Sequence, residues 1–351
     1  MCMEISSSKY SYKIQIMKKP TLSIAIKFAC LLFISQIFPL ISFGTEDQEI
    51  KKSLDLLRIA AKGHIEKKSC FACHNQAFPM LAFSTAIKKN YPIPSSEIKA
   101  QTDFILNFLQ KNEERYLQGK GTGGDADTAG YAMLTLELAG IKPNKTTDAV
   151  VVYFLKHQAA NGYWKVTSNR PPSEASNFTT NYLAIRALKF WGNPSLKKEI
   201  EDRSGKSLSY IRETNPVSNE DQVFKLLALN ELNAEKSQIQ SSAGQILGRQ
   251  KPDGGWAQIE GMETDPYATA TALVSLHMAG IINKDSKVFK DGIKYLSGKR
   301  KEDGSWFVKS RSKPFQTYYE SGFPHKNDQF ISVTASGWAT TALLLSLPEK
   351  N

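Results

Sequence analysis

The chain has 351 residues, and its composition, 41% hydrophobic, 10% aromatic and 23% charged, is that of a folded globular protein. This composition excludes a disordered chain, a collagen-like repeat and a disulfide scaffold. The formal net charge is +11, but the Lys and Arg residues are spread along helical segments and the sequence contains no nucleic-acid motif. We therefore predict a solvated surface and no nucleic-acid partner.

The first 44 residues are typical of an export signal. A pair of lysines precedes an apolar stretch over residues 28–43, and Ser42 and Gly44 are the small residues that a signal peptidase requires. The stretch is shorter than the ~20 apolar residues of a membrane-spanning helix. We therefore predict a mature periplasmic or extracellular protein that starts near Thr45 and has no stable membrane span; a membrane anchor is the alternative.

The sharpest chemical motif is Cys70-Phe71-Ala72-Cys73-His74, which holds the only two cysteines of the mature chain. Covalent attachment of haem c needs this pattern, because the two thiols add to the haem vinyl groups and His74 becomes an axial ligand of the iron. We predict a haem c site at residues 70–74, and with it a redox partner. A Cys70–Cys73 disulfide, and a zinc site that takes a further ligand from elsewhere, remain alternatives.

Three sixteen-residue segments superimpose without gaps: Asp125 to Gly140, Asn177 to Gly192 and Asp265 to Gly280. Each begins with Asp or Asn, residue types whose side-chain oxygen caps helix N-termini, and each ends with Gly, which stops helices in a left-handed conformation. The segments therefore predict a repeated helix that begins at its capping residue.

A loop that contains Gly and Trp precedes these helices. Asn or Asp followed by Gly makes a turn, and the Trp two residues later offers a flat surface for the turn to pack against. The repeated loop residues are Gln158, Trp164, Gln250, Asp253, Gly254, Trp256, Asp303, Gly304 and Trp306.

Extending this register over the mature chain gives six helix pairs. Because one pair cannot bury its apolar face alone, the pairs must stack around a continuous core. We predict a single domain over residues 45–351, with the Cys-x-x-Cys-His site in its first hairpin. The second helix of each pair is expected at about 76–90, 125–139, 177–191, 219–231, 265–279 and 330–347.

The pattern Gln-x-x-Asp-Gly-x-Trp, complete at residues 250–256, resembles the repeat of the prenyltransferase and squalene oxidase family, whose members include squalene-hopene cyclases. The resemblance implies an all-α (α/α)6 toroid of six helical hairpins, with the repeated helices as its inner ring. The tail from Ser305 to Leu347, together with the Cys-x-x-Cys-His motif near the mature N-terminus, resembles an exported bacterial subgroup of this family. The family further implies an apolar, isoprenoid-like ligand in the central cavity.

The resemblance implies less about activity. Hopene cyclases use a segment Asp-x-Asp-Asp-Thr-Ala whose middle Asp protonates the substrate, and the similar segment here makes Asp125 and Asp127 candidate catalytic residues. Ala126, however, stands at the protonating position. Helix capping is the alternative role of both aspartates. The zinc ligands of the prenyltransferases are not apparent in this sequence.

All connections from an outer to an inner helix are expected at one end of a toroid, which places Cys70 to His74 at the mouth of the central cavity. The long connection over residues 303–329 is expected to cover that mouth. His325 in this connection is the first candidate for the sixth iron ligand, with Met80 and His64 as alternatives. We expect an exported haem-bearing protein with a redox or ligand-binding role. A haem-free cyclase or transferase, and a non-enzymatic binding protein with a structural disulfide, are the alternatives.

Overall fold

The structure is a computed structural model that describes residues 46–313 and 317–348, and the predicted signal over residues 1–44 lies outside them. Residues 49–351 form one compact unit. Regular structure in the described part is helical, apart from two isolated bridges, Arg170 with Glu174 and Ala257 with Thr264. The predicted all-α fold is therefore confirmed. No described helix is long and apolar enough to cross a bilayer.

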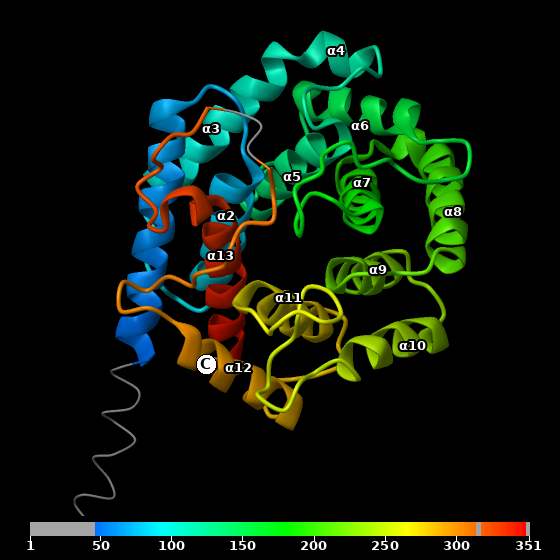
Figure 1. Cartoon of the computed structure of the whole chain (residues 1–351). Coiled ribbons are helices and arrows are strands. Elements are labelled where there is room, and N and C mark those ends of the chain that lie inside the picture. The colour runs from blue at the N-terminus through cyan, green and yellow to red at the C-terminus, as the bar shows by residue number, and fades with distance from the viewer. Residues whose placement is uncertain (1–45, 314–316, 349–351) are drawn as a thin grey trace, which may run out of the picture. The chain divides into compact units, whose positions relative to one another are not determined.

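Six helices form a closed inner ring. Each contacts the next, and the last contacts the first (Figure 1). A π-helical turn, η1 (Cys73–Ala77), leads into the first of them. The ring helices lie where the sequence predicts them: α2 (Phe78–Lys88), α5 (Asp125–Leu138), α7 (Asn177–Trp191), α9 (Asn219–Glu231), α11 (Pro266–Met278) and α13 (Gln329–Ser346).

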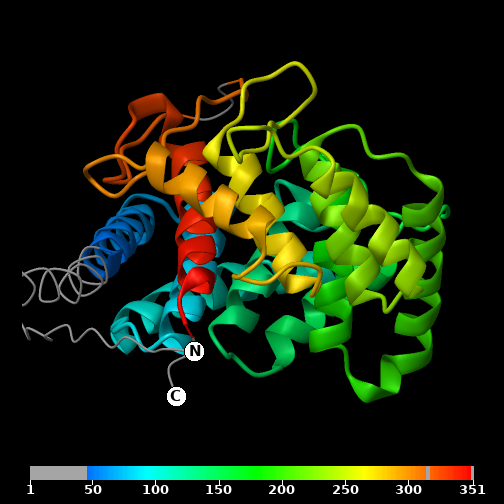
Figure 2. The ribbon, with the colours of Figure 1, turned by 90° about the horizontal axis from the view of Figure 1, so that it is seen from below.

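A second set of helices packs around this ring (Figure 1). In Figure 2 the yellow loop before α11 and the orange loop before α13 both lie at the upper end of the ring, as expected for connections from outer to inner helices. The outer helices are a helix over residues 46–67, α3 (Ser95–Lys111), α4 (Glu113–Leu117), α6 (Lys145–His157), α8 (Lys197–Glu213), α10 (Lys236–Leu247) and α12 (Lys287–Lys299). The described part also contains two short 3₁₀ helices, η2 (Pro194–Leu196) and η3 (Lys326–Asp328).

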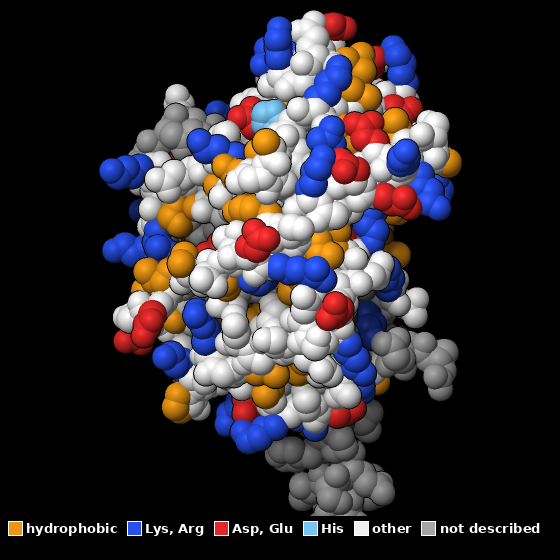
Figure 3. Space-filling view, turned by 90° about the vertical axis from the view of Figure 1, so that its right-hand side faces the viewer, with side chains coloured by type: hydrophobic (Ala, Val, Ile, Leu, Met, Phe, Trp, Pro, Cys, Tyr) orange, Lys and Arg blue, Asp and Glu red, His pale blue; other side chains and the backbone are white. Residues whose placement is uncertain are grey.

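The outer helices keep their charged side chains in water. On α8, Lys206 pairs with Asp202 at 2.7 Å, and Arg203 pairs with Glu199 at 3.4 Å. Figure 3 shows the side of the molecule that carries α8, where Lys and Arg are interspersed with Asp and Glu. Exposed pairs of this kind contribute little to stability, but they favour the solvated surface that the sequence predicts.

The inner helices approach one another closely because their side chains are small. A Cβ atom on Gly337 of α13 would lie 2.6 Å from the carbonyl oxygen of Phe78, so only glycine fits there. Hydroxyl groups in the ring donate to carbonyls of their own helix, as Thr271 does to Tyr267 at 2.9 Å. Polar side chains can therefore be buried between the helices without partners from a neighbour.

The three predicted Trp loops share one geometry. Each indole is fully buried and donates from Nε1 to the carbonyl ten residues earlier, on the outer helix that precedes the loop. The pairs are Trp164 with Phe154 at 2.9 Å, Trp256 with Ile246 at 2.8 Å and Trp306 with Leu296 at 2.7 Å. The tryptophan thus anchors its loop to the end of the outer helix.

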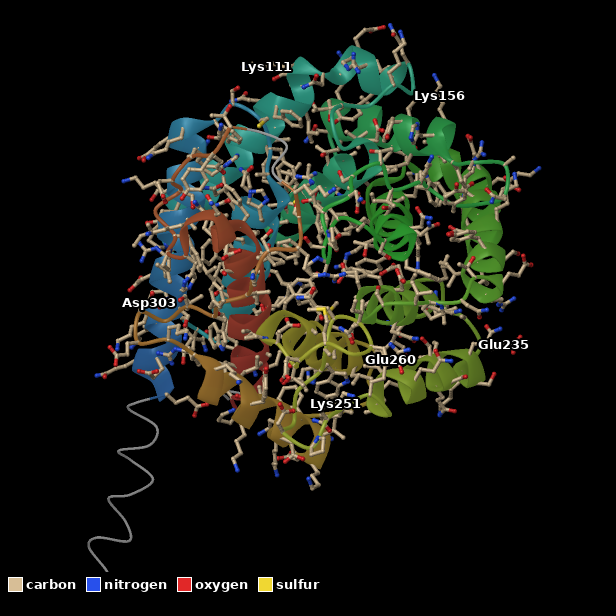
Figure 4. All side chains as sticks on the ribbon, in the orientation of Figure 1. Lys111, Lys156, Glu235, Lys251, Glu260 and Asp303 are labelled. Atoms are coloured by element: carbon tan, nitrogen blue, oxygen red, sulfur yellow. The ribbon has the colours of Figure 1, made fainter. Side chains whose placement is uncertain are left out.

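The same loops connect each pair to the next. Nε2 of Gln158 donates to the carbonyl of Arg203 in α8 at 2.9 Å, and Nε2 of Gln250 donates to that of Val288 in α12 at 3.0 Å. The third loop has Arg300 at this place, and its guanidinium pairs with Glu49. Figure 4 labels Asp303 beside the helix of residues 46–67, where this third loop closes the outer ring.

The predicted helix caps are only partly correct. Asp265 caps α11, since its Oδ1 accepts from the backbone N–H of Ala268 at 3.0 Å. Asp125 makes no capping bond, because Gly124 precedes α5 in a left-handed conformation with φ of 83°. Ser176, not Asn177, caps α7. The capping roles expected for Asp125 and Asn177 are therefore wrong.

Candidate functional site

A cavity of about 1090 Å³ lies beside the N-terminal ends of α2, α5 and α7. It is bordered by Cys70, Cys73 and His74, by Asp127, and by the connection between α6 and α7. Its size reaches the upper end of the ~300–1,000 Å³ that ligand pockets span. The structure therefore brings the two predicted sites, the Cys-x-x-Cys-His motif and the Asp-bearing helix, to one cavity.

The axis of the inner ring is filled by aromatic side chains. The ring of Phe78 lies 5.3 Å from that of Tyr131 and 6.0 Å from that of Trp338, measured between centroids. Tyr131 borders the large cavity on one side and a space of only about 40 Å³ on the other. Room for a ligand therefore lies at the N-terminal end of the ring, and the space beyond Tyr131 is small.

Cys73, His74 and Glu174 form a buried cluster on the wall of the cavity. The Sγ atom of Cys73 donates to Oε1 of Glu174 and lies 3.9 Å from Nδ1 of His74. The turn that carries Glu174 is fixed by two backbone hydrogen bonds with Arg170, at 3.0 and 3.1 Å. The Arg170 guanidinium also pairs with the second carboxylate oxygen of Glu174.

Burial sets the protonation of this cluster. It raises the pKa of the Cys73 thiol well above its ordinary value and lowers the pKa of His74 well below it, so the thiol and the imidazole are both neutral at pH 7. Burial also raises the pKa of Glu174, against the opposing charge of Arg170. Nε2 of His74 is buried and has no hydrogen-bond partner.

The other half of the motif is held differently. Cys70 is exposed, and both thiols are free, so the structure contains no Cys70–Cys73 disulfide. His64 also borders the cavity. Its Nε2 lies 2.7 Å from the carbonyl oxygen of Cys70, and its Nδ1 lies 2.6 Å from the hydroxyl of Tyr319. Because a carbonyl only accepts, Nε2 donates and Nδ1 accepts, which uses both ring nitrogens.

Asp127 is a buried acid in the first turn of α5. Its Oδ1 accepts from the hydroxyl of Thr180, and its Oδ2 has no hydrogen-bond partner. Burial is the largest cause that raises the pKa of Asp127, to about 7, while the hydroxyl bond opposes the shift. In a large fraction of the protein molecules, the Asp127 carboxyl group therefore carries a proton at neutral pH.

Three residues named from the sequence lie elsewhere. Asp125 does not border the cavity. His325 lies at the third Trp loop, where its Nε2 is 2.7 Å from Oγ of Ser305, and the structure does not bring it to His74. Met80 is buried in α2 and also lies outside the lining of the cavity. Among the expected sixth ligands, only His64 borders the cavity.

The connection over residues 303–329, which the sequence predicts to cover the cavity mouth, contributes Arg311, Lys313 and Tyr319 to the lining, and its residues 314–316 lie outside the described part. Glu174 contacts Cys73 and Thr180 contacts Asp127, and the sequence reveals neither residue. The cavity is also rich in cationic side chains, of which two come from this connection. The cationic residues are Lys68, Arg115, Arg170, Arg311 and Lys313, whereas the acidic residues of the lining are Asp127 and Glu174. This lining favours an anionic ligand or an anionic group of a larger one.

Comparison with known proteins shows the fold. No family model and no curated protein matches the chain. The type II terpene cyclase MstE from Scytonema is a solved structure with a TM-score of 0.54 at 15% identity, covering 85% of this chain and 98% of its own. A protein from Actinoplanes has a TM-score of 0.54 at 12% identity, and the match covers 86% of this chain and 99% of that protein. A variant of MstE was solved with geranylgeranyl dihydroxybenzoate, which is named as its substrate. Its TM-score is 0.52 at 12% identity, and the match covers 85% of this chain and 98% of that one. The chain thus has the α/α-toroid fold of the type II terpene cyclases.

Proposed function

We propose that the chain is a cyclase-type enzyme in which Asp127 donates a proton to an alkene of an isoprenoid-like substrate. The observation that carries this proposal is the buried carboxyl of Asp127 on the wall of a large cavity. Its pKa is raised to about 7 by burial, and its Oδ2 has no partner. A general acid works best when its pKa lies near the operating pH.

In this mechanism the Asp127 proton is transferred to one alkene carbon, and the π electron pair forms the new C–H bond. The resulting carbocation is attacked by a neighbouring alkene, which closes a ring. Loss of a proton to water ends the reaction, and the Asp127 carboxylate regains its proton from solvent. The product is an isomer of the substrate. Phe71, Phe108 and Tyr131 border the cavity and offer aromatic faces to the cationic stage.

The proposed substrate has an apolar isoprenoid body and an anionic group. The cationic lining of the cavity supports the anionic group, and Lys313 and Arg115 have side chains long enough to meet it. The substrate of the MstE variant, geranylgeranyl dihydroxybenzoate, combines both features. In the resembling cyclases the acid stands at the position of Ala126. The proposed donor here, Asp127, is the next residue, so its side chain leaves the helix in a different direction.

The experiment incubates the mature protein with prenylated aromatic acids of different chain length and looks for a cyclised isomer. Asp127→Asn keeps the shape of the side chain and removes the acidic proton, so conversion should fall at least ~100-fold. Asp125→Asn is the matched control on the same helix turn and should retain conversion. Failure of the folded protein to convert any of these acids would contradict the proposal.

A second candidate function is a redox role with covalently bound haem c. The observation that favours it is that Cys70, Cys73 and His74 all border the cavity, with both thiols free and Nε2 of His74 unpartnered. The two cysteines and His74 would hold the haem, and the cationic lining would pair with its propionates. The group would supply one-electron chemistry and require a redox partner.

Haem attachment depends on export, which the signal over residues 1–44 predicts and which we include in the proposal. A host that matures cytochromes c should then yield protein that begins near Thr45 and gives a pyridine haemochrome spectrum. The Cys70→Ser/Cys73→Ser double variant should lose that spectrum. Exported protein without covalent haem would remove this candidate.

A further inference from the structure

We infer that Cys73, His74 and Glu174 bind a zinc ion whose fourth position opens to the cavity. The inference goes beyond the proposed acid role of Asp127, and it competes with haem for Cys73 and His74. One ligand atom from each of the three residues lies within 4.8 Å of the other two. A thiolate, an imidazole nitrogen and a carboxylate oxygen form a donor set that zinc binds.

The three side chains come from two rigid elements. Cys73 and His74 open the π-helical turn η1, and Glu174 stands on the turn closed by its two backbone hydrogen bonds to Arg170. All three residues are more than nine-tenths buried. Metal ligands held on rigid elements need little reorganisation on binding, which favours affinity.

The ring nitrogens of His74 support the assignment independently. Nδ1 faces the Cys73 thiol, and Nε2 is buried without a hydrogen-bond partner. At 3.9 Å from Sγ, Nδ1 has no strong hydrogen bond and lies beside the thiol and the carboxylate, where it can bind the same ion as these two groups.

The charge balance of the site suits a divalent ion. On binding, the Sγ–H bond of Cys73 breaks, a bond forms between Sγ and the metal, and the proton leaves to solvent. The thiolate and the Glu174 carboxylate together neutralise the two positive charges of the ion. Glu174 keeps its second oxygen on Arg170, an outer contact that would orient the carboxylate.

The donor set also selects the ion. Calcium and magnesium require oxygen ligands, which one carboxylate does not satisfy, whereas zinc accepts mixed sulfur, nitrogen and oxygen ligands in a tetrahedral arrangement. Catalytic zinc sites have three protein ligands and one open position. All three residues border the cavity of about 1090 Å³, so water or an anionic group of a ligand can take that position.

The test titrates the full mature chain, reduced and freed of metal, with zinc chloride, and repeats the titration with cobalt chloride. We expect one ion per chain, release of about one proton at neutral pH, and a cobalt complex with thiolate-to-metal absorption. Cys73→Ser and Glu174→Gln should each weaken binding by at least ~10–100-fold, the loss that even an outer partner's removal causes.

Two variants make the outcome specific. Cys70→Ser removes the other thiol of the motif and should leave zinc affinity unchanged, whereas haem attachment needs both cysteines. Asp127→Asn should also leave it unchanged, so a failure of the proposed acid role does not affect this test. A cobalt complex without thiolate absorption, or equal losses in Cys70→Ser and Cys73→Ser, would overturn the zinc site. So would covalent haem on both cysteines of the exported protein.

Discussion

At the scale of single residues, two buried acids of the inner ring, Glu220 and Asp127, accept hydrogen bonds from hydroxyl groups and pair with no cation among the described residues. Glu220 accepts from the hydroxyls of Thr179 at 3.0 Å and Tyr267 at 2.7 Å, and burial raises the pKa of Glu220 to about 8. Asp127 follows the same rule with Thr180. Hydroxyl donors only partly oppose the cost of burying a charge, so Glu220 is mostly protonated at neutral pH and Asp127, with a pKa of about 7, is protonated in part.

Glu220 makes the stability of the fold depend on pH. Its pKa is about 4.5 when unfolded and about 8 when folded. The unfolded chain loses this proton first, so the free energy of unfolding falls as pH rises through that window, by up to ~1.4 kcal/mol per pH unit. Glu220→Gln should remove this contribution and give a smaller decrease between pH 5 and pH 8. Urea denaturation of the wild-type protein and of Glu220→Gln at several pH values measures this free energy of unfolding. The same dependence on pH in both proteins would contradict the raised pKa of Glu220.

At the scale of the elements, the Trp loops join neighbouring helix pairs through glycine. Gly254 has φ of +86°, and a Cβ atom there would lie 2.5 Å from the carbonyl oxygen of Asp291 in α12. Gly162 and Gly304 make the same close approach to α8 and to the helix over residues 46–67. The glycine of the motif is therefore required twice, by the turn and by the next outer helix.

Substitution separates these two requirements. Gly261 has a similar φ of +81° but no neighbouring atom within 4 Å of the added Cβ position. Gly261→Ala should cost only the ~1–2 kcal/mol of a left-handed alanine, whereas Gly254→Ala should cost ~1–3 kcal/mol more because it also overpacks against α12. Thermal denaturation compares the two variants, and equal losses would show that the contact with α12 does not matter.

The elements were predictable because their signals are local. The Gln-x-x-Asp-Gly-x-Trp loops and the small-residue segments mark each pair, and the helices occur where they are expected. The cap of α11 was predictable, but those of α5 and α7 were not, since the flanking residues Gly124 and Ser176 determine where these two helices begin. Gly192 ends α7 with φ of −65°, outside the left-handed conformation that the repeat predicts.

The site was predictable only in part, for the same physical reason. Cys70 to His74 and Asp127 were visible as local motifs. The contact between Cys73 and Glu174 spans 101 positions, and that between Asp127 and Thr180 spans 53. No local pattern marks Glu174 or Thr180, because only packing of the helix pairs brings Glu174 to Cys73 and Thr180 to Asp127. The metal-ligand set therefore emerges only in three dimensions.

At the scale of the whole molecule, the ring closes through contacts between its first and last pairs. Oγ of Ser53 donates to the carbonyl of Gly304 at 2.7 Å, and Arg300 pairs with Glu49. Closure gathers the connections that precede the inner helices at one end, and the aromatic side chains on the axis leave the ligand space at that end. One cavity thus contains a protonated acid, a cationic lining and a metal-ligand cluster.

The central claim is that this cavity delivers a proton from Asp127 to a ligand. The most direct measurement is mass spectrometry of the product formed from a prenylated aromatic acid in D₂O. In D₂O the exchangeable proton of Asp127 is replaced by deuterium, so the cyclised isomer should carry one deuterium on carbon, and Asp127→Asn should form no product. A product without deuterium, or undiminished labelled product from Asp127→Asn, would contradict the claim.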